Sequence, residues 1–129
     1  MKNKKQFQGW RAEQIAKVFL LNSGLFDLTE ITNYSHKDKG YDFIGILKAN
    51  QNKRLGIDVK ATKYSKSEIK NKLFSKTYLS ELPLLQLFVN YDKESGYFRI
   101  VTENRKSELK VMKRETLINE IKNYAQQWL

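Results

Sequence analysis

Two charged residues, Asp58 and Lys60, lie in the segment of this chain whose pattern is most typical of a β-strand. Residues two apart in a strand point to the same face, so the carboxylate and the ammonium group share one surface. The apolar residues that alternate with them, on the opposite face, are Leu55, Ile57 and Val59. Aspartate is depleted in strands, and its place within a good one indicates either a solvated face or a chemical role.

Two further carboxylates belong to the elements that precede this strand. Asp42 opens an apolar segment. The carboxylates of Asp42 and Asp58 converge if this segment and the next form a hairpin. Glu13 lies in a segment with helical spacing, beside Ala12 and Ala16, which are small enough for the helix to approach a sheet closely. We therefore expect Glu13 to reach the same pocket.

Carboxylates without cysteine, and with a single histidine in the chain, make an oxygen-rich site. Such ligands suit Mg²⁺ or Mn²⁺ and not zinc. A lysine beside a bound metal ion fits phosphodiester hydrolysis, in which cations stabilise the charge that develops on the phosphate. The sequence thus favours chemistry on a phosphate-bearing substrate.

The composition agrees with an anionic partner. The chain has 129 residues, 24 Lys and Arg against 14 Asp and Glu, and a net charge of +10. Nucleic acid is the first candidate for the partner and an anionic membrane surface the second. The absence of cysteine excludes disulfides and thiol nucleophiles. No apolar run is long enough to span a membrane. We therefore expect a cytoplasmic location.

The elements that must position these side chains follow from periodicity and from turn residues. We expect one domain over residues 1–129, an α/β fold with a mixed central sheet between helices. Helices are predicted over residues 7–23 and 116–129, strands over 26–32, 41–49 and 55–62, a partly helical connection over 63–81, and a hairpin of strands 84–91 and 97–103 with a turn at 92–96.

The order Glu13, Asp42 and then Asp58-Val59-Lys60 resembles the PD-(D/E)XK nuclease superfamily, and the surrounding residues 9–62 are similar to its small restriction-endonuclease-like and Holliday-junction-resolvase-like domains. The resemblance implies a restriction-endonuclease-like fold and an Mg²⁺- or Mn²⁺-dependent DNA endonuclease that leaves 5′-phosphate and 3′-hydroxyl ends. Tyr41 departs from the pattern, which has proline there.

The resemblance also implies a role for each residue. Asp42 and Asp58 would be metal ligands, with the backbone carbonyl of Val59 as a further ligand. Lys60 would position or activate the attacking water, and Glu13 would act as an outer ligand or orient water. A single-site domain that cuts both strands needs two copies, so a homodimer is expected. Lysines that flank the site in sequence are candidates for phosphate contacts, namely Lys39, Lys63 and Lys66.

Simpler interpretations remain open at this point. Asp58 and Lys60 would form a weak surface ion pair, Asp42 would be a turn or strand-start residue, and Glu13 would pair with Lys17 along the helix. A non-catalytic nucleic-acid-binding or protein-interaction module on the same fold is the main alternative function. An inhibitor or immunity factor whose basic face meets an acidic partner is the third.

Overall fold

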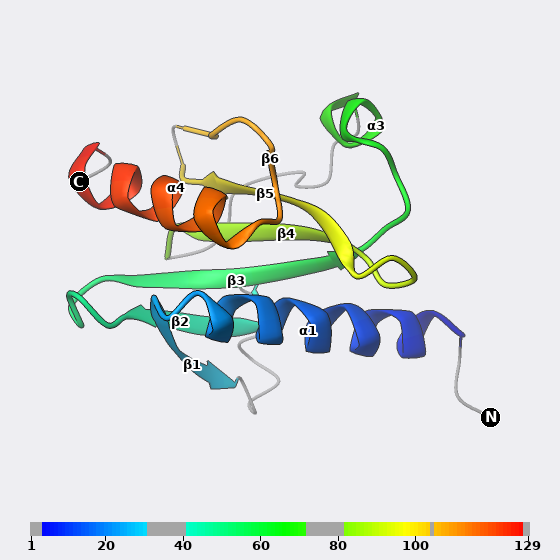
Figure 1. The fold of residues 1–129 in the computed structure, drawn as a ribbon, viewed down its shortest axis with the longest axis horizontal. Helices are drawn as coiled ribbons and strands as arrows, with labels where there is room; N and C mark the ends of the chain where they lie inside the picture. Colours follow the sequence, from blue (N-terminus) through cyan, green and yellow to red (C-terminus); the bar gives the residue numbers. More distant parts are fainter. Residues whose placement is uncertain (1–3, 31–40, 72–81, 104, 128–129) are drawn as a thin grey trace.

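The computed structural model describes residues 4–30, 41–71, 82–103 and 105–127. Figure 1 shows the described elements arranged around one sheet. In chain order they are α1 (Lys4–Asn22), β1 (Phe26–Glu30), β2 (Phe43–Leu47), β3 (Arg54–Ala61), α3 (Lys66–Asn71), β4 (Leu84–Asn90), β5 (Ser95–Val101), β6 (Lys110–Val111) and α4 (Arg114–Gln127).

The six strands form a single sheet whose spatial order is the same as their order in the chain. Every neighbouring pair is antiparallel except β3 and β4, which are parallel. A parallel pair needs a crossover connection, and the segment that contains α3 supplies it. The mixed sheet flanked by helices is therefore confirmed, and β2 and β3 pair antiparallel, which is the condition set for the carboxylates of Asp42 and Asp58 to converge.

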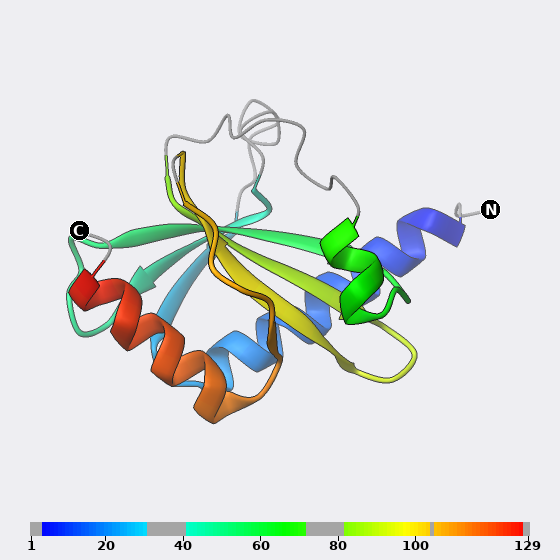
Figure 2. The ribbon, with the colours of Figure 1, turned by 90° about the horizontal axis from the view of Figure 1, so that it is seen from above.

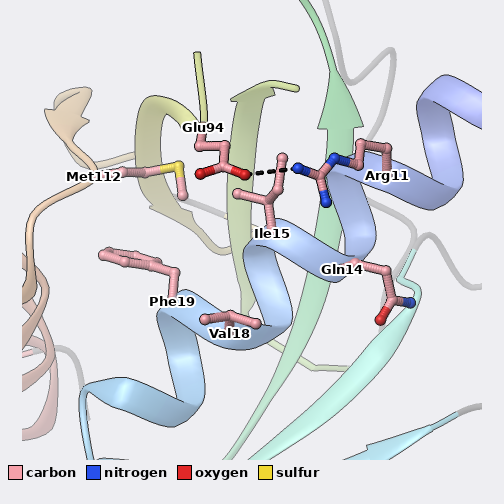
Figure 3. Close-up of a pocket in the computed structure, with 7 residues that line it drawn as sticks. All are labelled: Arg11, Gln14, Ile15, Val18, Phe19, Glu94 and Met112. Carbon is pink, nitrogen blue, oxygen red and sulfur yellow. Dashed lines mark hydrogen bonds and ion pairs between the residues drawn. The ribbon is translucent and has the colours of Figure 1, made fainter. Parts of the chain in front are cut away.

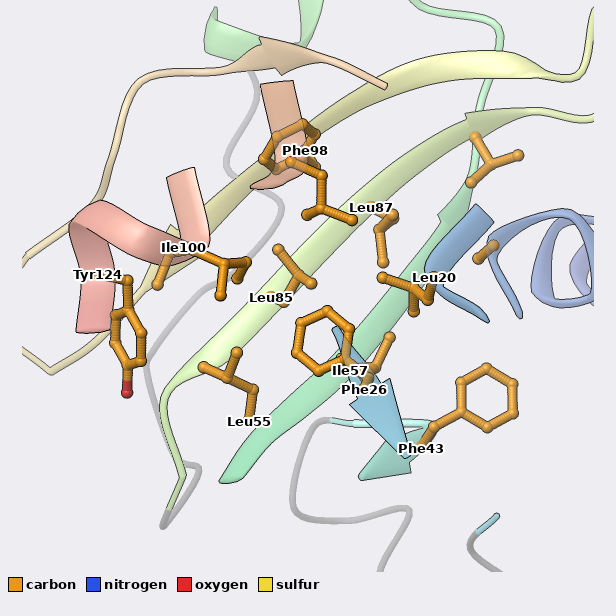
Figure 4. Close-up of a cluster of buried hydrophobic side chains, with 14 of the residues drawn as sticks. Leu20, Phe26, Phe43, Leu55, Ile57, Leu85, Leu87, Phe98, Ile100 and Tyr124 are labelled. Carbon is orange, nitrogen blue, oxygen red and sulfur yellow. The ribbon is translucent and has the colours of Figure 1, made fainter. Parts of the chain in front are cut away.

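The main hydrophobic core lies between one face of the sheet and the helices α1 and α4 (Figure 4). Strand β3 contributes Leu55 and Ile57 to it, and both are fully buried. Helix α1 contributes Ala12 and Ala16, also fully buried, so their lack of bulk lets the helix axis lie close to the sheet as expected. This close approach brings Glu13 to the level of the strands.

The opposite face of the sheet carries α3 (Figure 2) and two smaller apolar clusters. Ile69 of α3 is fully buried against Phe88 of β4 and Leu109. At the other end of this face, Tyr41 packs with Leu84 and with Val101 of β5. The Asp58 and Lys60 side chains leave β3 on this second face, between the two clusters.

Some predicted boundaries were wrong. The turn between β4 and β5 comprises residues 91–94 and not 92–96, because the side chain of Asn90 accepts hydrogen bonds from the N–H groups of Asp92 and Lys93 and because Glu94 takes a left-handed conformation at φ 50°. Gly96 is thus part of β5. Strand β6, only two residues long, was not predicted, and α1 and α4 begin at residues 4 and 114 instead of 7 and 116.

None of the helices within the described residues is both long and apolar enough to cross a membrane. The predictions made for residues 31–40 and 72–81 lie outside the described part of the chain, and Lys39 is among them.

Candidate functional site

Asp42 sits where the backbone pairing between β2 and β3 ends. Its N–H donates to the carbonyl oxygen of Ile57 at 2.7 Å, which is the last step of the backbone ladder on this side. Its Oδ2 atom then accepts a hydrogen bond from the N–H of Val59 at 2.8 Å. The side chain of Asp42 thus continues the ladder in place of backbone, and it is held against the residue between Asp58 and Lys60.

Asp58 and Lys60 lie side by side on β3, as the alternation predicts. The Lys60 Nζ atom is 3.4 Å from Asp58 Oδ2. The side chain of Lys60 is 28% exposed and that of Asp58 is 13% exposed. An ion pair this sheltered is less screened by solvent than one on an open surface. The weak exposed pair considered for these two residues therefore does not describe them.

Two residues that the sequence analysis did not select continue this cluster across the sheet. Gln86 on β4 is paired with Asp58 in the strand register, and Arg99 on β5 is paired with Gln86. Gln86 Nε2 donates to Asp58 Oδ2 at 3.0 Å, and Arg99 Nε donates to Gln86 Oε1 at 2.8 Å. A polar glutamine between Leu85 and Leu87 of an otherwise apolar strand was the available signal.

These two side chains are deeply placed. Gln86 is 1% exposed and Arg99 8% exposed, with the guanidinium 5.3 Å from the centre of the Phe88 ring. Burial lowers the pKa of Arg99, and the negative charge of Asp58 opposes that shift. The carboxylate of Asp58 therefore has two cations near it, Lys60 directly and Arg99 through Gln86.

The environment of Asp42 is different, because burial dominates. Desolvation raises the pKa of Asp42 above 3.8, and the charge of Asp58 raises it further. The hydrogen bond from Val59, a side-chain hydrogen bond with Glu13 and the charge of Lys60 all act in the opposite direction. The side-chain contact with Glu13 means that the two carboxyl groups lie within hydrogen-bonding reach of each other. The structure thus brings Glu13 from α1 to Asp42.

The donor chemistry of this cluster fits a hard divalent cation. Asp42 and Asp58 are close enough for their charges to repel, and a cation between carboxylates relieves such repulsion. Within the described residues, however, no group of three or more His, Cys, Asp or Glu side chains is arranged to hold a metal ion. The metal ligands that the resemblance implies, with Glu13 and the Val59 carbonyl among them, therefore stay a prediction.

The two candidate phosphate-binding lysines that the structure describes lie just beyond β3. Lys63 is exposed and pairs with Asp92 at 2.9 Å, and that contact raises the pKa of Lys63. Lys66 is exposed at the first position of α3. A cavity of about 350 Å³ opens between α3 and the β4–β5 turn, with Lys63, Ser65 and Lys93 among its lining residues.

Tyr41, the residue that replaces the proline of the pattern, has a packing role. Its ring lies over Gly56 so closely that a Cβ atom at position 56 would be 2.9 Å from both Cγ and Cδ1 of the tyrosine. Tyr41 is itself buried at 5% exposure. This contact fixes the residue that precedes Asp42 against the strand that carries Asp58.

Comparisons of the chain with protein-family models, with curated proteins and with solved structures gave no match.

Proposed function

We propose that this chain is a metal-dependent DNA endonuclease of the PD-(D/E)XK type, with a restriction-endonuclease-like fold. The observation that carries the proposal is the hydrogen bond from the Val59 N–H to Asp42 Oδ2. It ties the separate aspartate of the pattern to Val59, the centre of the Asp58-Val59-Lys60 segment, 17 residues further along the sequence. The net charge of +10 supports a polyanionic substrate.

Each residue has a role that its surroundings support. Asp42 and Asp58 would hold Mg²⁺ or Mn²⁺, with the Val59 carbonyl as a further ligand, and the ion would stabilise the negative charge that develops on the phosphate. Lys60 would orient the attacking water and add positive charge next to the phosphate. Glu13, which reaches Asp42 from α1, would act as an outer ligand or orient metal-bound water. Water attacks phosphorus, the bond to the 3′-oxygen breaks, and 5′-phosphate and 3′-hydroxyl ends result.

DNA is the proposed substrate, and two copies would be required to cut both strands. Lys63 and Lys66 would contact phosphates next to the site, because both are exposed where the chain leaves β3.

A non-catalytic module on the same fold is the second candidate. Asp58 already accepts a hydrogen bond from Gln86 and pairs with Lys60, and Asp42 already accepts one from Val59, so these side chains also serve the sheet. In a binding module, these interactions within the sheet would be the only role of the Asp42 and Asp58 side chains. DNA would then bind without being cut, and Mg²⁺ would not bind at the carboxylates.

The decisive experiment is a cleavage assay with Mg²⁺ or Mn²⁺ on supercoiled plasmid, linear duplex, single strands and branched DNA. Asp58→Ala and Lys60→Ala should abolish cleavage. Asp27→Ala is the matched control, because Asp27 is an exposed strand aspartate on β1, and it should cut like the parent protein. Equal cleavage by Asp58→Ala would refute the proposal, and DNA binding without cleavage by the folded parent would favour the binding module.

A further inference from the structure

Helix α1 has apolar residues on two opposite faces. One face carries Ala12, Ala16 and Leu20, which are fully buried against the sheet. The other face points away from the sheet, as helical spacing at about 100° per residue requires. It carries Phe7, Trp10, Val18 and Leu21, which are 53%, 54%, 58% and 52% exposed. We call these four residues the outer stripe.

The outer stripe is as large as the apolar patches that often mark functional surfaces. Four side chains of this size, each about half exposed, present on the order of 400 to 500 Å² of apolar area per chain, within the roughly 300 to 600 Å² of the largest patch on a typical monomer. The rings of Phe7 and Trp10 contact each other at 6.2 Å between centroids. Figures 1 and 2 show that the first turns of α1, the helix that carries both rings, extend beyond the strands.

A hollow runs alongside the outer stripe. A cavity of about 260 Å³ lies between α1 and the β4–β5 turn, and Val18 stands at its rim (Figure 3). Ile15, Phe19 and Met112 line its apolar part, and the ion pair between Arg11 and Glu94 closes one end at 2.6 Å. The side chains of the outer stripe form a ridge, and the hollow forms a groove beside it. Helices pack by fitting the ridges of one into the grooves of the other.

The spacing of the stripe is symmetric about Gln14. Trp10 and Val18 lie four residues to either side of it, and Phe7 and Leu21 lie seven residues to either side. Two copies of α1 that meet antiparallel about a two-fold axis at Gln14 therefore bring Trp10 of each copy to Val18 of the other. The same arrangement brings Phe7 of each copy to Leu21 of the other. A two-fold contact requires such self-complementarity.

We propose that the outer stripe of α1 is the contact surface of a homodimer in which the two helices pack antiparallel with Gln14 at the two-fold axis. The stripes of two copies would bury roughly 900 Å², close to the roughly 1,000 Å² expected of a specific interface, and Gln14 and the walls of the adjacent hollow would add to this area. The inference does not depend on nuclease activity, because the oligomeric state is measured without DNA or metal.

The first test measures mass in solution against concentration by sedimentation or light scattering. The parent chain should have twice the 15.3 kDa of one copy at micromolar concentration. Trp10→Lys and Val18→Glu should each weaken association by at least about a hundredfold, as hot-spot residues do. Val111→Glu is the matched control, since Val111 is 44% exposed on β6, and it should remain dimeric. A monomeric parent protein would overturn the proposal.

The geometry has its own test. In the antiparallel arrangement the double variant Trp10→Lys with Val18→Glu sets each lysine opposite a glutamate of the other copy, so its loss of association should be smaller than the sum of the two single-variant losses. A parallel arrangement would set like charges together, and a double-variant loss that equals or exceeds this sum contradicts the proposed pairing. Circular dichroism of every variant separates lost association from lost folding.

The lack of cysteine allows a measurement that no repulsive substitution affects. Gln14→Cys introduces the only thiol in the chain, at the proposed two-fold axis, and mild oxidation should convert most of it to a covalent dimer. Lys122→Cys, exposed on α4, should cross-link far less at the same concentration. Equal cross-linking of the two variants would show random encounter and would overturn the proposal.

Discussion

Asp42 Oδ2 accepts a hydrogen bond from the backbone N–H of Val59 at 2.8 Å, although Asp42 immediately precedes β2 and Val59 lies in β3. The bond joins the start of β2 to the segment of β3 that carries Asp58 and Lys60. Because burial also raises the pKa of Asp42, the carboxylate is held at a position that disfavours its charge. Such a balance is typical of a functional group whose position is fixed by its surroundings.

Replacing Asp42 with asparagine should stabilise the fold while it abolishes cleavage. With its pKa above 3.8, Asp42 holds its proton to higher pH in the folded chain than in the unfolded chain, and its contribution to stability falls as the pH rises through the window above 3.8. Asparagine does not ionise, so it removes this decrease in stability with pH, and its side-chain oxygen can still accept the hydrogen bond from the Val59 N–H. The free energy of unfolding of Asp42→Asn, minus that of the parent, should therefore increase with pH.

Urea unfolding in metal-free buffer at a series of pH values measures this difference. Asp42→Ala is the companion variant, because it removes the charge and also leaves the Val59 N–H without its acceptor, a loss of about 1 to 3 kcal/mol relative to asparagine. A difference between Asp42→Asn and parent that falls or stays level with pH would contradict the assigned burial effect.

Gln86→Glu should impair the candidate site without leaving a cavity in the sheet. The glutamate keeps an oxygen for Arg99 but replaces the amide that donates to Asp58 with a second carboxylate. Repulsion between the two carboxylates should displace Asp58, so the rate of cleavage should fall by at least about tenfold. Cleavage kinetics check this against the exposed control Gln126→Glu on α4, and unchanged kinetics in Gln86→Glu would show that Gln86 does not position Asp58.

Lys63 and Asp92 should affect DNA binding in opposite directions. Asp92 now pairs with Lys63 at 2.9 Å, so Asp92→Asn should release the lysine for phosphate and tighten binding at low salt. Lys63→Ala should reduce the slope of log affinity against log salt by up to about 0.9, the value for one phosphate contact on duplex DNA. Fluorescence anisotropy over a salt series measures both slopes, and a slope for Lys63→Ala equal to the parent's places Lys63 outside the DNA contact.

Gly96→Ala should destabilise the fold strongly. A Cβ atom at position 96 would be 2.0 Å from the carbonyl oxygen of Phe88 on the neighbouring strand, so β4 and β5 would have to separate. We expect a loss of at least about 2 kcal/mol in the free energy of unfolding. Gly9→Ala on α1, where nothing lies within 4 Å, should instead add about 0.5 to 1 kcal/mol. Thermal or urea unfolding that ranks the two alike would contradict the tight packing at Gly96.

The elements with strong periodicity were the ones that the sequence predicts well. Helix α1 and strand β3 follow from spacing alone, because each buries a regular set of residues against the core. Strand β6 could not be predicted, since two residues carry no period. The end of the β4–β5 turn was misplaced because Gly96 suggests a turn, whereas the structure uses it where two strands leave no room for a side chain.

The candidate site divides in the same way. Asp58 and Lys60 share a face because they are two residues apart, which spacing predicts. The contributions of Gln86 and Arg99 depend on the register of β3, β4 and β5, and register across a parallel crossover leaves no mark in the sequence. The apolar outer stripe of α1 was missed because spacing identifies apolar residues without showing which of them the sheet covers.

The contact between Tyr41 and Gly56 means that these two positions constrain each other. A side chain at position 56 would overlap the tyrosine ring and the Cδ2 atom of Leu84, so a chain that carries one there needs a smaller residue at position 41 and a shift of Leu84. Among relatives of this protein the two positions should therefore covary, with the aromatic ring accompanying glycine. A sequence motif that requires proline before the first aspartate would therefore miss every chain in which an aromatic ring packs on a glycine of the neighbouring strand instead.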